Sequence, residues 1–323
     1  MQLIINNSTN PAFNLALEEY ALMEMKRDVT MLWRNEASVI IGCNQNAIEE
    51  IDQDFVRQNS IPVVRRLSGG GAVFHDLGNI NFTVICELED DAFGNYRKFA
   101  EPVCEFLRDL GVDAAFSGRN DLVIDGAKFS GNAQTSNAGR IMHHGTILFD
   151  ADIARLARAL KPGPAKIESK GVKSVHSRVT NVSEHLQEPL SVEQFFGQLA
   201  DFFRKRTDGQ YLPTASDIEA VQQLAAEKYD NWAWNFGHSP TYSHRRSGCF
   251  PFGTVDVRLQ VENGFIKDAH IFGDFFGILE VKELESRLIG AQHNAESIGK
   301  ALEGLTLSDY IRGATKEQFL ELV

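Results

Sequence analysis

The chain has 323 residues, of which 43% are hydrophobic and 24% are charged, proportions of a globular protein that exclude wholesale disorder. Its 32 basic and 44 acidic residues give a net charge of −12, which argues against general binding to nucleic acids or anionic membranes. No apolar run approaches the ~18 residues that cross a bilayer, and the amino terminus carries no secretory signal. Four scattered cysteines fit a reducing compartment. We therefore expect a cytoplasmic globular protein, monomeric by default.

The amino-terminal part alternates helices with short strands. Asn10 as cap and Pro11 in the first turn predict a helix with one apolar face that runs through Ala21. A second helix is predicted over 99–110 and ends at Gly111, a residue suited to the position after a helix. Between the two helices, β-rich runs predict strands at 31–34, 38–42, 63–67 and 81–86.

The middle of the chain continues this mixture. A helix is predicted over 153–160, before two prolines. Two capping boxes, Ser191 with Gln194 and Ser216 with Glu219, each predict the start of a helix. Ahead of them, strands are predicted at 121–124, 127–130 and 146–149.

An aromatic, glycine-rich stretch over 232–253 indicates a domain boundary. Strict alternation at Val255, Val257, Leu259 and Val261 predicts a strand, and the dipeptide Asn-Gly after it predicts a type I′ turn into a second strand at 265–272. Apolar spacing in the tail predicts helices.

The predicted fold class is α+β, without regular β-α-β alternation. We expect a large domain of mixed β-sheets packed with helices over residues 1–243. A small C-terminal α/β domain is expected over residues 244–323.

The densest chemical signal is the run RRLSGGGAVFHD, which begins at Arg65. Three consecutive glycines allow the backbone to approach a ligand closely, so that their N–H groups converge on an anion. Arg65 and Arg66 add charge and paired donors. The run is neither a P-loop nor a dinucleotide fingerprint. A tight glycine hairpin with solvated arginines is the alternative.

A second signal is the run GRNDLVIDGAKFSG. Asp125 and Gly126 form a hairpin turn between two strands, and Lys128 opens the second strand among small residues. A lysine there could neutralise charge on a phosphate or carboxylate, although a solvated edge-strand lysine is the commoner case. Asn120 and Asp121 carry oxygen atoms of the kind that Mg²⁺ prefers when it also holds nucleotide phosphates.

The adjacent residues His143 and His144 precede a predicted strand. Neighbouring strand residues point to opposite faces, so the pair is not expected to share a metal ion. We expect one histidine to be buried and the other to lie at the surface.

The segment 161–181 carries four lysines and one arginine against one glutamate, a local charge of +4. Its proline, glycine and serine content predicts a loop that folds over an anionic ligand. A merely solvated loop is the alternative.

These runs together resemble the lipoate–protein ligase A family. The resemblance rests on RRLSGGGAVFHDLGN, GRNDLVIDGAKFSGNAQ and HHGTILF, and extends to NPAFNLALEEY, IESKGVKSVHSRVTNV, WNFG and FGDFFG, so it covers essentially the whole chain. Cys43, in IGCNQN, departs from it, because many relatives carry a basic residue there.

The resemblance implies a biotin/lipoate ligase-like catalytic domain with a C-terminal accessory lid. It implies that ATP and Mg²⁺ activate lipoate to lipoyl-AMP with release of pyrophosphate. The lipoyl group would then pass to a lysine of a lipoyl-domain protein, such as a 2-oxoacid dehydrogenase acyltransferase subunit or the glycine-cleavage H protein.

The resemblance also assigns site residues. Lys128 would be catalytic, touching both the carboxyl and the phosphate, and Asp121 would be the Mg²⁺ ligand. The adenylate contacts would be Arg66, Gly71, Ala72, Val73, Phe74, Asn120, Asp121 and Lys128. The lipoate contacts would be Leu15, Leu17, Glu19, Trp33, Arg66, Ser68, Gly71, His75, Lys128, Ala133 and His144. The adenylate-binding loop would contain Lys170, Gly171, Val172, Lys173, Ser174 and Val175.

The main alternative is an octanoyl or lipoyl transferase that moves an acyl group between carrier proteins without ATP. Such relatives use a cysteine after the H-G-T strand, whereas here no cysteine lies between Cys104 and Cys249. A biotin ligase is disfavoured because its glycine loop is interrupted by arginines. A non-catalytic lipoate- or nucleotide-binding regulator is disfavoured by the presence of Lys128.

Overall fold

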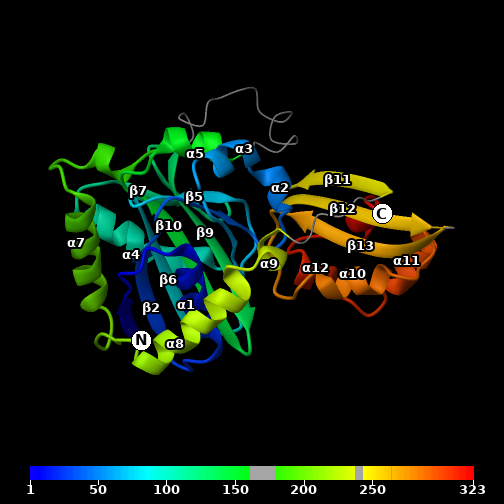
Figure 1. Cartoon of the computed structure of the whole chain (residues 1–323), viewed down its shortest axis with the longest axis horizontal. Helices are drawn as coiled ribbons and strands as arrows, with labels where there is room; N and C mark the ends of the chain where they lie inside the picture. The colour runs from blue at the N-terminus through cyan, green and yellow to red at the C-terminus, as the bar shows by residue number, and fades with distance from the viewer. Residues whose placement is uncertain (161–178, 237–242, 263) are drawn as a thin grey trace.

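The computed structural model describes residues 1–160, 179–236, 243–262 and 264–323. The described elements form two bodies (Figure 1). The large body is packed in three layers, and the smaller body is built around a sheet of its own. Mixed sheets packed with helices, followed by a small C-terminal domain of antiparallel strands and helices, confirm the predicted α+β class. No helix in the described part of the chain is long and apolar enough to span a bilayer.

A seven-stranded sheet forms the middle layer of the large body. Its first pair of strands is parallel and its other pairs are antiparallel. In spatial order the strands are β1 (Gln2–Ile5), β2 (Val29–Arg34), β6 (Asn79–Glu87), β10 (Arg140–Leu148), β9 (Ala127–Asn137), β8 (Asp121–Ile124) and β7 (Ala114–Ser117).

Helices cover both faces of this sheet, and its strands are therefore buried on both sides. In β2, Leu32 packs with the core beneath α4 (Tyr96–Asp109) and α7 (Val192–Arg204). Its neighbour Trp33 packs on the opposite side. That side is covered by α1 (Pro11–Met23), α8 (Ala215–Leu224) and a π-helical turn (Ala225–Tyr229).

A second sheet of three short strands brings the glycine-rich run beside the large sheet. Its strands are β4 (Val63–Arg65), β3 (Ser38–Ile41) and β5 (Val73–His75), with β3 in the middle. The glycines form the connection from β4 to β5. Around this sheet lie α2 (Ala47–Glu50), α3 (Gln53–Gln58), α5 (Ile153–Ala159) and α9 (Trp232–Phe236). A 3-10 turn at Val182–His185 precedes α7 in the chain.

The C-terminal body has an antiparallel sheet and a separate apolar core. Its strands are β11 (His244–Phe250), β12 (Gly253–Glu262) and β13 (Phe265–Gly273). Its helices are α10 (Lys282–Leu288), α11 (Ala295–Ala301), α12 (Leu307–Tyr310) and α13 (Lys316–Leu320). In Figure 1 this body lies to the right of the large one, and α9 is drawn between them. The exact boundary at 243/244 stays a prediction.

Polar contacts join the two bodies. The amide of Gly273 donates to the carbonyl oxygen of Asn44 at 2.7 Å. Arg258 and Arg245 in the C-terminal sheet pair with Glu49 at 2.6 and 3.1 Å. Because Glu49 lies in α2, these contacts fasten the C-terminal sheet to the helices around the small sheet.

Most predicted elements are confirmed, with one wrong cap. The second capping box consists of Thr214 and Asp217, two residues before the predicted pair of Ser216 and Glu219. Thr214 is the cap because its hydroxyl accepts from the main-chain amide of Asp217. In return, the Asp217 carboxylate accepts from the main-chain amide of Thr214. β12 and β13 pair as predicted, but residue 263 of the predicted turn lies outside the described residues. The sequence patterns did not predict β1, β5, β7, β11, α2, α3 or α9.

Candidate active site

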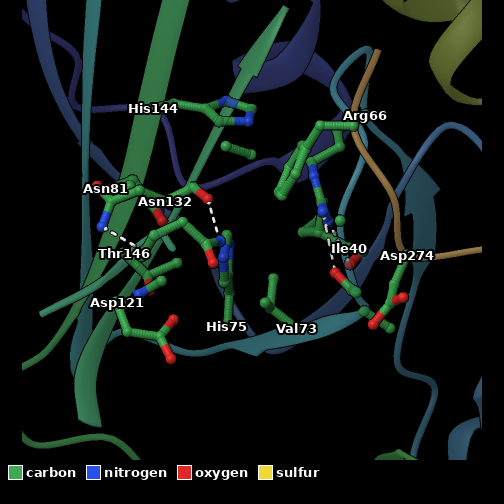
Figure 2. Close-up of a pocket in the computed structure, with 18 of the residues that line it drawn as sticks. Ile40, Arg66, Val73, His75, Asn81, Asp121, Asn132, His144, Thr146 and Asp274 are labelled. Carbon is green, nitrogen blue, oxygen red and sulfur yellow. Dashed lines mark hydrogen bonds between the residues drawn. The ribbon is translucent and has the colours of Figure 1, made fainter. Parts of the chain in front are cut away.

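A cavity of about 310 Å³ opens between the two sheets of the large body. The C-terminal body closes one side of it with Asp274 and Phe276. Figure 2 shows Arg66 and Asp121 on opposite sides of this cavity, with Asp274 near Arg66. The cavity therefore has a cation at one wall and a carboxylate across from it.

The glycine run is shaped by contact with the C-terminal body as well as by the cavity. Gly70 has a φ of +90°, which favours glycine. A Cβ on Gly69 would lie 2.4 Å from the carbonyl oxygen of Phe275, and one on Gly70 would lie 3.1 Å from the ring of Phe276. Two of the three glycines thus make room for the segment that follows β13, and Gly71 lines the cavity.

Arg66 is a buried cation at the cavity wall. Its Nη2 donates to the carbonyl oxygens of Gly69 at 2.6 Å and Gly71 at 2.9 Å, and its Nε donates to Ser68 Oγ at 3.0 Å. Burial lowers the pKa of Arg66 to about 10, so it stays charged at neutral pH. No carboxylate of the described residues lies within ion-pair distance of it. An anionic ligand would supply the missing counter-charge.

Arg65 does not contact the cavity, although the sequence suggested that both arginines bind the ligand. Its guanidinium donates to main-chain carbonyl oxygens of two segments, among them Gln45 at 2.6 Å and Asn235 at 3.0 Å. Arg65 instead ties the loop after β3 to α9.

Lys128 and Asp121 face the cavity from neighbouring strands. Lys128 Nζ lies 2.7 Å from Asp121 Oδ1, and both side chains are more than one-third exposed. The predicted turn before Lys128 is confirmed by positive φ at Asp125 and Gly126. The main-chain carbonyl oxygen of Lys128 also accepts from the amide of Thr180 at 2.9 Å.

His75 is held as a neutral imidazole. Asn35 Nδ2 donates to its Nδ1 at 3.0 Å, which leaves the proton on Nε2. Burial, with the nearby positive charge of Arg66, lowers the pKa of His75 to about 3. The Nε2 atom is buried and has no hydrogen-bond partner among the described residues.

His143 and His144 point to opposite faces of β10, as predicted, but both are buried. His143 is enclosed by Gln134 and Asn132, and burial moves its pKa well below the ordinary value. His144 lines the cavity and bonds to Glu18 and Ser68. The expectation of one surface histidine is wrong, because the helix α1 covers that face of the sheet.

The structure brings most of the predicted site residues together. On the cavity lie Leu15, Trp33, Arg66, Gly71, Ala72, Val73, His75, Asn120, Asp121, Lys128, Ala133 and His144. Ser68 stands behind Arg66 and His144. Three predicted residues lie elsewhere: Leu17 packs under α8, Phe74 faces the core of the small sheet, and Glu19 borders a second cavity.

Local geometry accounts for the placements of Phe74 and Glu19. Phe74 alternates with Val73 and His75 along β5, so it points away from the cavity. Glu19 accepts from Lys228 Nζ at 2.8 Å and from the Tyr229 hydroxyl at 2.6 Å, which holds its carboxylate on the far side of α1.

The predicted adenylate-binding loop, 170–175, lies outside the described residues. Cys43 lies on the second cavity, and burial raises the pKa of its thiol to about 11. It is therefore a neutral thiol away from the first cavity, and the departure at this position does not alter the walls of that cavity.

Comparison with known families gives two matches in sequence order. The family model described as "Lipoyl protein ligase A/B catalytic domain" matches residues 10–204, and "Bacterial lipoate protein ligase C-terminus" matches residues 239–323. The chain belongs to the lipoate–protein ligase A family. The second match accounts for the C-terminal body, and membership identifies the chain as an enzyme of the ligase class.

Relatives match this ligase over most or nearly all of its length. Lipoate-protein ligase LplJ of Bacillus subtilis is 46% identical over 323 residues, 98% of each chain. The crystal structure of P. falciparum LipL1 in complex with lipoate is 25% identical, with a TM-score of 0.78 over 99% of this chain and 97% of that one. A lipoate-protein ligase A bound with ATP is 28% identical, with a TM-score of 0.62 over 73% of this chain and 98% of that one.

Several residues around the cavity of this ligase were not predicted. Arg119 donates to the carbonyl oxygen of Phe252, and its guanidinium lies 4.7 Å from the centroid of the Phe276 ring. Its place next to Asn120 in the conspicuous motif was an available signal. Glu18 and Thr83 form a layer behind the cavity, and only the packing of α1 against β6 reveals them.

Proposed function

We propose that this ligase activates lipoate with ATP to form lipoyl-AMP and pyrophosphate, and then transfers the lipoyl group to a lysine of a lipoyl-domain protein. Acyltransferase subunits of 2-oxoacid dehydrogenases and the glycine-cleavage H protein are the proposed acceptors. The observation that carries the proposal is the pair of cations at one cavity, buried Arg66 beside the glycine loop and Lys128 across from it.

In the first step a lipoate carboxylate oxygen attacks the α-phosphorus of ATP. The bond to the β-phosphate breaks, and pyrophosphate leaves. Negative charge grows on the phosphoryl oxygens and on the leaving group, so fixed cations and backbone N–H groups lower the barrier. Arg66 is charged and restrained by the carbonyl oxygens it contacts, which provides such a fixed cation.

Lys128 serves as the second cation in this proposal. It is paired with Asp121 when no ligand is bound, at partly exposed positions where an ion pair has little net stability. Exchange of that carboxylate for the substrate's own carboxylate and phosphate therefore costs little. The room for this movement comes from Gly131, where a Cβ would lie 2.8 Å from Lys128 Nζ.

Mg²⁺ would be held by Asp121 together with nucleotide phosphates. Mg²⁺ commonly takes one or two carboxylates and fills its remaining positions with phosphate oxygens and water, so a single carboxylate beside the cavity fits. Among the described residues no group of three or more acidic, histidine or cysteine side chains could hold a metal alone. The ion would neutralise charge on the phosphates.

In the second step the acceptor lysine amine attacks the acyl carbonyl of lipoyl-AMP. The bond to AMP breaks, AMP leaves with the electron pair, and the amine loses a proton to solvent. Until the lysine arrives, water must be kept from this mixed anhydride. Asp274 and Phe276 of the C-terminal body close one side of the cavity, which supports this role for that body.

A transferase that works without ATP would need a nucleophile to carry the acyl group. No cysteine appears among the described residues that line the cavity. Burial raises the pKa values of Cys43 and Cys104 to about 11, which makes both thiols poor nucleophiles. These observations favour the ligase over the transferase.

The test is pyrophosphate release from the purified protein with ATP, Mg²⁺ and lipoate in the absence of an acceptor. The proposal expects release that depends on lipoate, and replacement by octanoate or biotin then ranks the acids. An enzyme that releases no pyrophosphate, yet transfers an acyl group from an acylated carrier protein, would be a transferase and would overturn the proposal.

A further inference from the structure

A chain of buried polar side chains runs from α1 to the cavity. The Thr83 hydroxyl donates to Glu18 Oε1 at 2.5 Å, and His144 Nδ1 lies 3.0 Å from the same oxygen. His144 Nε2 lies 2.6 Å from Ser68 Oγ. Ser68 Oγ in turn lies 3.0 Å from Nε of Arg66. Glu18, Ser68, His144 and Arg66 are all at most 8% exposed.

The ends of this chain set the direction of its outer hydrogen bonds. A guanidinium only donates and a carboxylate only accepts. Ser68 Oγ therefore accepts from Arg66 Nε, and His144 Nδ1 carries a proton that it donates to Glu18. With the Ser68 proton in the bond to His144 Nε2, every proton of the chain is used and His144 is the Nδ1–H tautomer.

Glu18 is the carboxylate whose charge acts on Arg66. It raises the pKa of Arg66 against the larger lowering effect of burial. Its carboxylate accepts only from the Thr83 hydroxyl and from His144 among the described residues. The negative charge at α1 is thus linked to the cation at the cavity through the side chains of His144 and Ser68.

We propose that Glu18 is a positioning residue for the ligase reaction, which fixes Arg66 and the glycine loop through His144 and Ser68. The inference rests on the proposed function in that Arg66 is taken to bind the acyl-adenylate. Loss of the Glu18 charge frees the imidazole to turn or change tautomer, and Ser68 then no longer presents a fixed acceptor to Arg66 Nε. Arg66 in turn holds Gly69 and Gly71.

Acid, histidine and serine in this order also occur in hydrolases, where the serine is the nucleophile. Here Ser68 has no exposed surface, and its Oγ already accepts from Arg66. The chain therefore serves orientation and not covalent catalysis.

The kinetic test compares Glu18→Gln, Ser68→Ala and the double variant in lipoate-dependent pyrophosphate release. Each single change should lower kcat/KM for lipoate by about tenfold or more, as expected for a lost hydrogen bond to a charged group. Because both act through one chain, the double variant should lose no more than the worse single variant. Losses that multiply would contradict a common path and overturn the inference.

Asp217→Asn is the matched control. Asp217 is also a buried carboxylate of the large body, and it accepts from the hydroxyls of Tyr20 and Tyr211, away from the cavity. This variant should lower the melting temperature and leave kcat/KM near the wild-type value. An equal kinetic loss in the control would assign the Glu18 effect to general destabilisation.

The tautomer of His144 provides a readout that does not depend on activity. Two-bond ¹H–¹⁵N NMR of the imidazole rings should show the neutral Nδ1–H form for His144 in the wild-type enzyme. A neutral Nε2–H form would overturn the inference even in a fully active ligase. Conversely, a wild-type enzyme without pyrophosphate release contradicts the proposed function, while the NMR result still decides on the chain.

Discussion

Lys128 is the residue at which the sequence motif and the cavity agree most directly. Its ammonium group lies at the cavity and pairs with the partly exposed Asp121, so its removal leaves no buried charge behind. We therefore expect Lys128→Ala to fold normally and to lose adenylation by about 10²–10³-fold, the size typical of one lost electrostatic contact to a transition state.

Pyrophosphate release in single turnover measures this loss. Lys98→Ala is the control, because Lys98 pairs with Glu89 in an exposed ion pair and does not line the cavity. Unchanged pyrophosphate release by Lys128→Ala would remove this lysine from the mechanism.

The buried neutral histidines predict an acid-sensitive fold. His75 has a pKa of about 3 and His143 one well below the ordinary value, both through burial, whereas the unfolded chain binds these protons near pH 6.5. Below pH 6.5 the unfolded state therefore holds more protons, and stability falls as the pH falls. Each histidine should cost about 1 kcal/mol of unfolding free energy per pH unit in this range.

Urea unfolding at pH 7.0 and 5.5 measures this loss. Histidine NMR signals provide the direct check, since His75 and His143 should not titrate in the folded protein between pH 7 and 5. Titration of either ring near pH 6.5 would contradict the prediction.

Which glutamate serves the site could not be read from the sequence. Glu18 and Glu19 are adjacent, and helical periodicity distinguishes their faces only if one side of the helix meets solvent. α1 is buried on nearly all sides, between the sheet and α8, so an apolar stripe marks no unique inner face. Glycine, lysine and arginine motifs were recognisable because their chemistry is local, whereas the Glu18 contact depends on three distant segments.

At the scale of elements, capping chemistry explains both the correct and the incorrect predictions. Side chains that close their own helix, such as Asn10 and Ser191, act over three residues and are visible in the sequence. Where two hydroxyl residues stand close together, as with Thr214 and Ser216, backbone geometry decides which one caps the helix, and the prediction of Ser216 was wrong. β1 was missed because a strand this short is recognised by its partner β2 more than by its composition.

Gly197 offers a test of helix propensity in α7. It lies on the exposed side of this helix, and a Cβ there would meet nothing within 4 Å. Gly197→Ala should stabilise the large body by about 0.5–1 kcal/mol, because alanine loses less backbone freedom in a helix. Chemical denaturation measures the gain.

The matched change at Gly69 should have the opposite sign. A Cβ there would lie 2.4 Å from the carbonyl oxygen of Phe275, so Gly69→Ala forces the two bodies apart at the cavity. If Gly69→Ala is as stable and active as Gly197→Ala, the close packing of the glycine run against the C-terminal body is contradicted.

For the whole molecule, the placement of the C-terminal body has a functional consequence. Asp274 and Phe276 close the cavity, yet an acceptor lysine must later reach the acyl carbonyl there. Some contacts between the bodies are polar, as with Glu49 and Arg258, while Phe276 packs on Tyr96 and Ala133 at the cavity, so that reorientation would open the cavity on this side. We expect the C-terminal body to reorient once the adenylate forms.

Small-angle scattering of the free enzyme and of the enzyme with a non-hydrolysable lipoyl-adenylate analogue tests this movement. The prediction is a measurable change in the radius of gyration. Superimposable scattering curves for the two states would count strongly against it.

The chain from Glu18 to Arg66 also gives the interior an electric dipole. Its two opposite charges are separated by His144 and Ser68, and the positive end faces the cavity. A protein with a net charge of −12 thereby presents an attractive potential to anions at one point. Small oxyanions of ordinary buffers, such as sulfate and phosphate, will compete there with the substrate, and measured lipoate affinities will depend on the buffer.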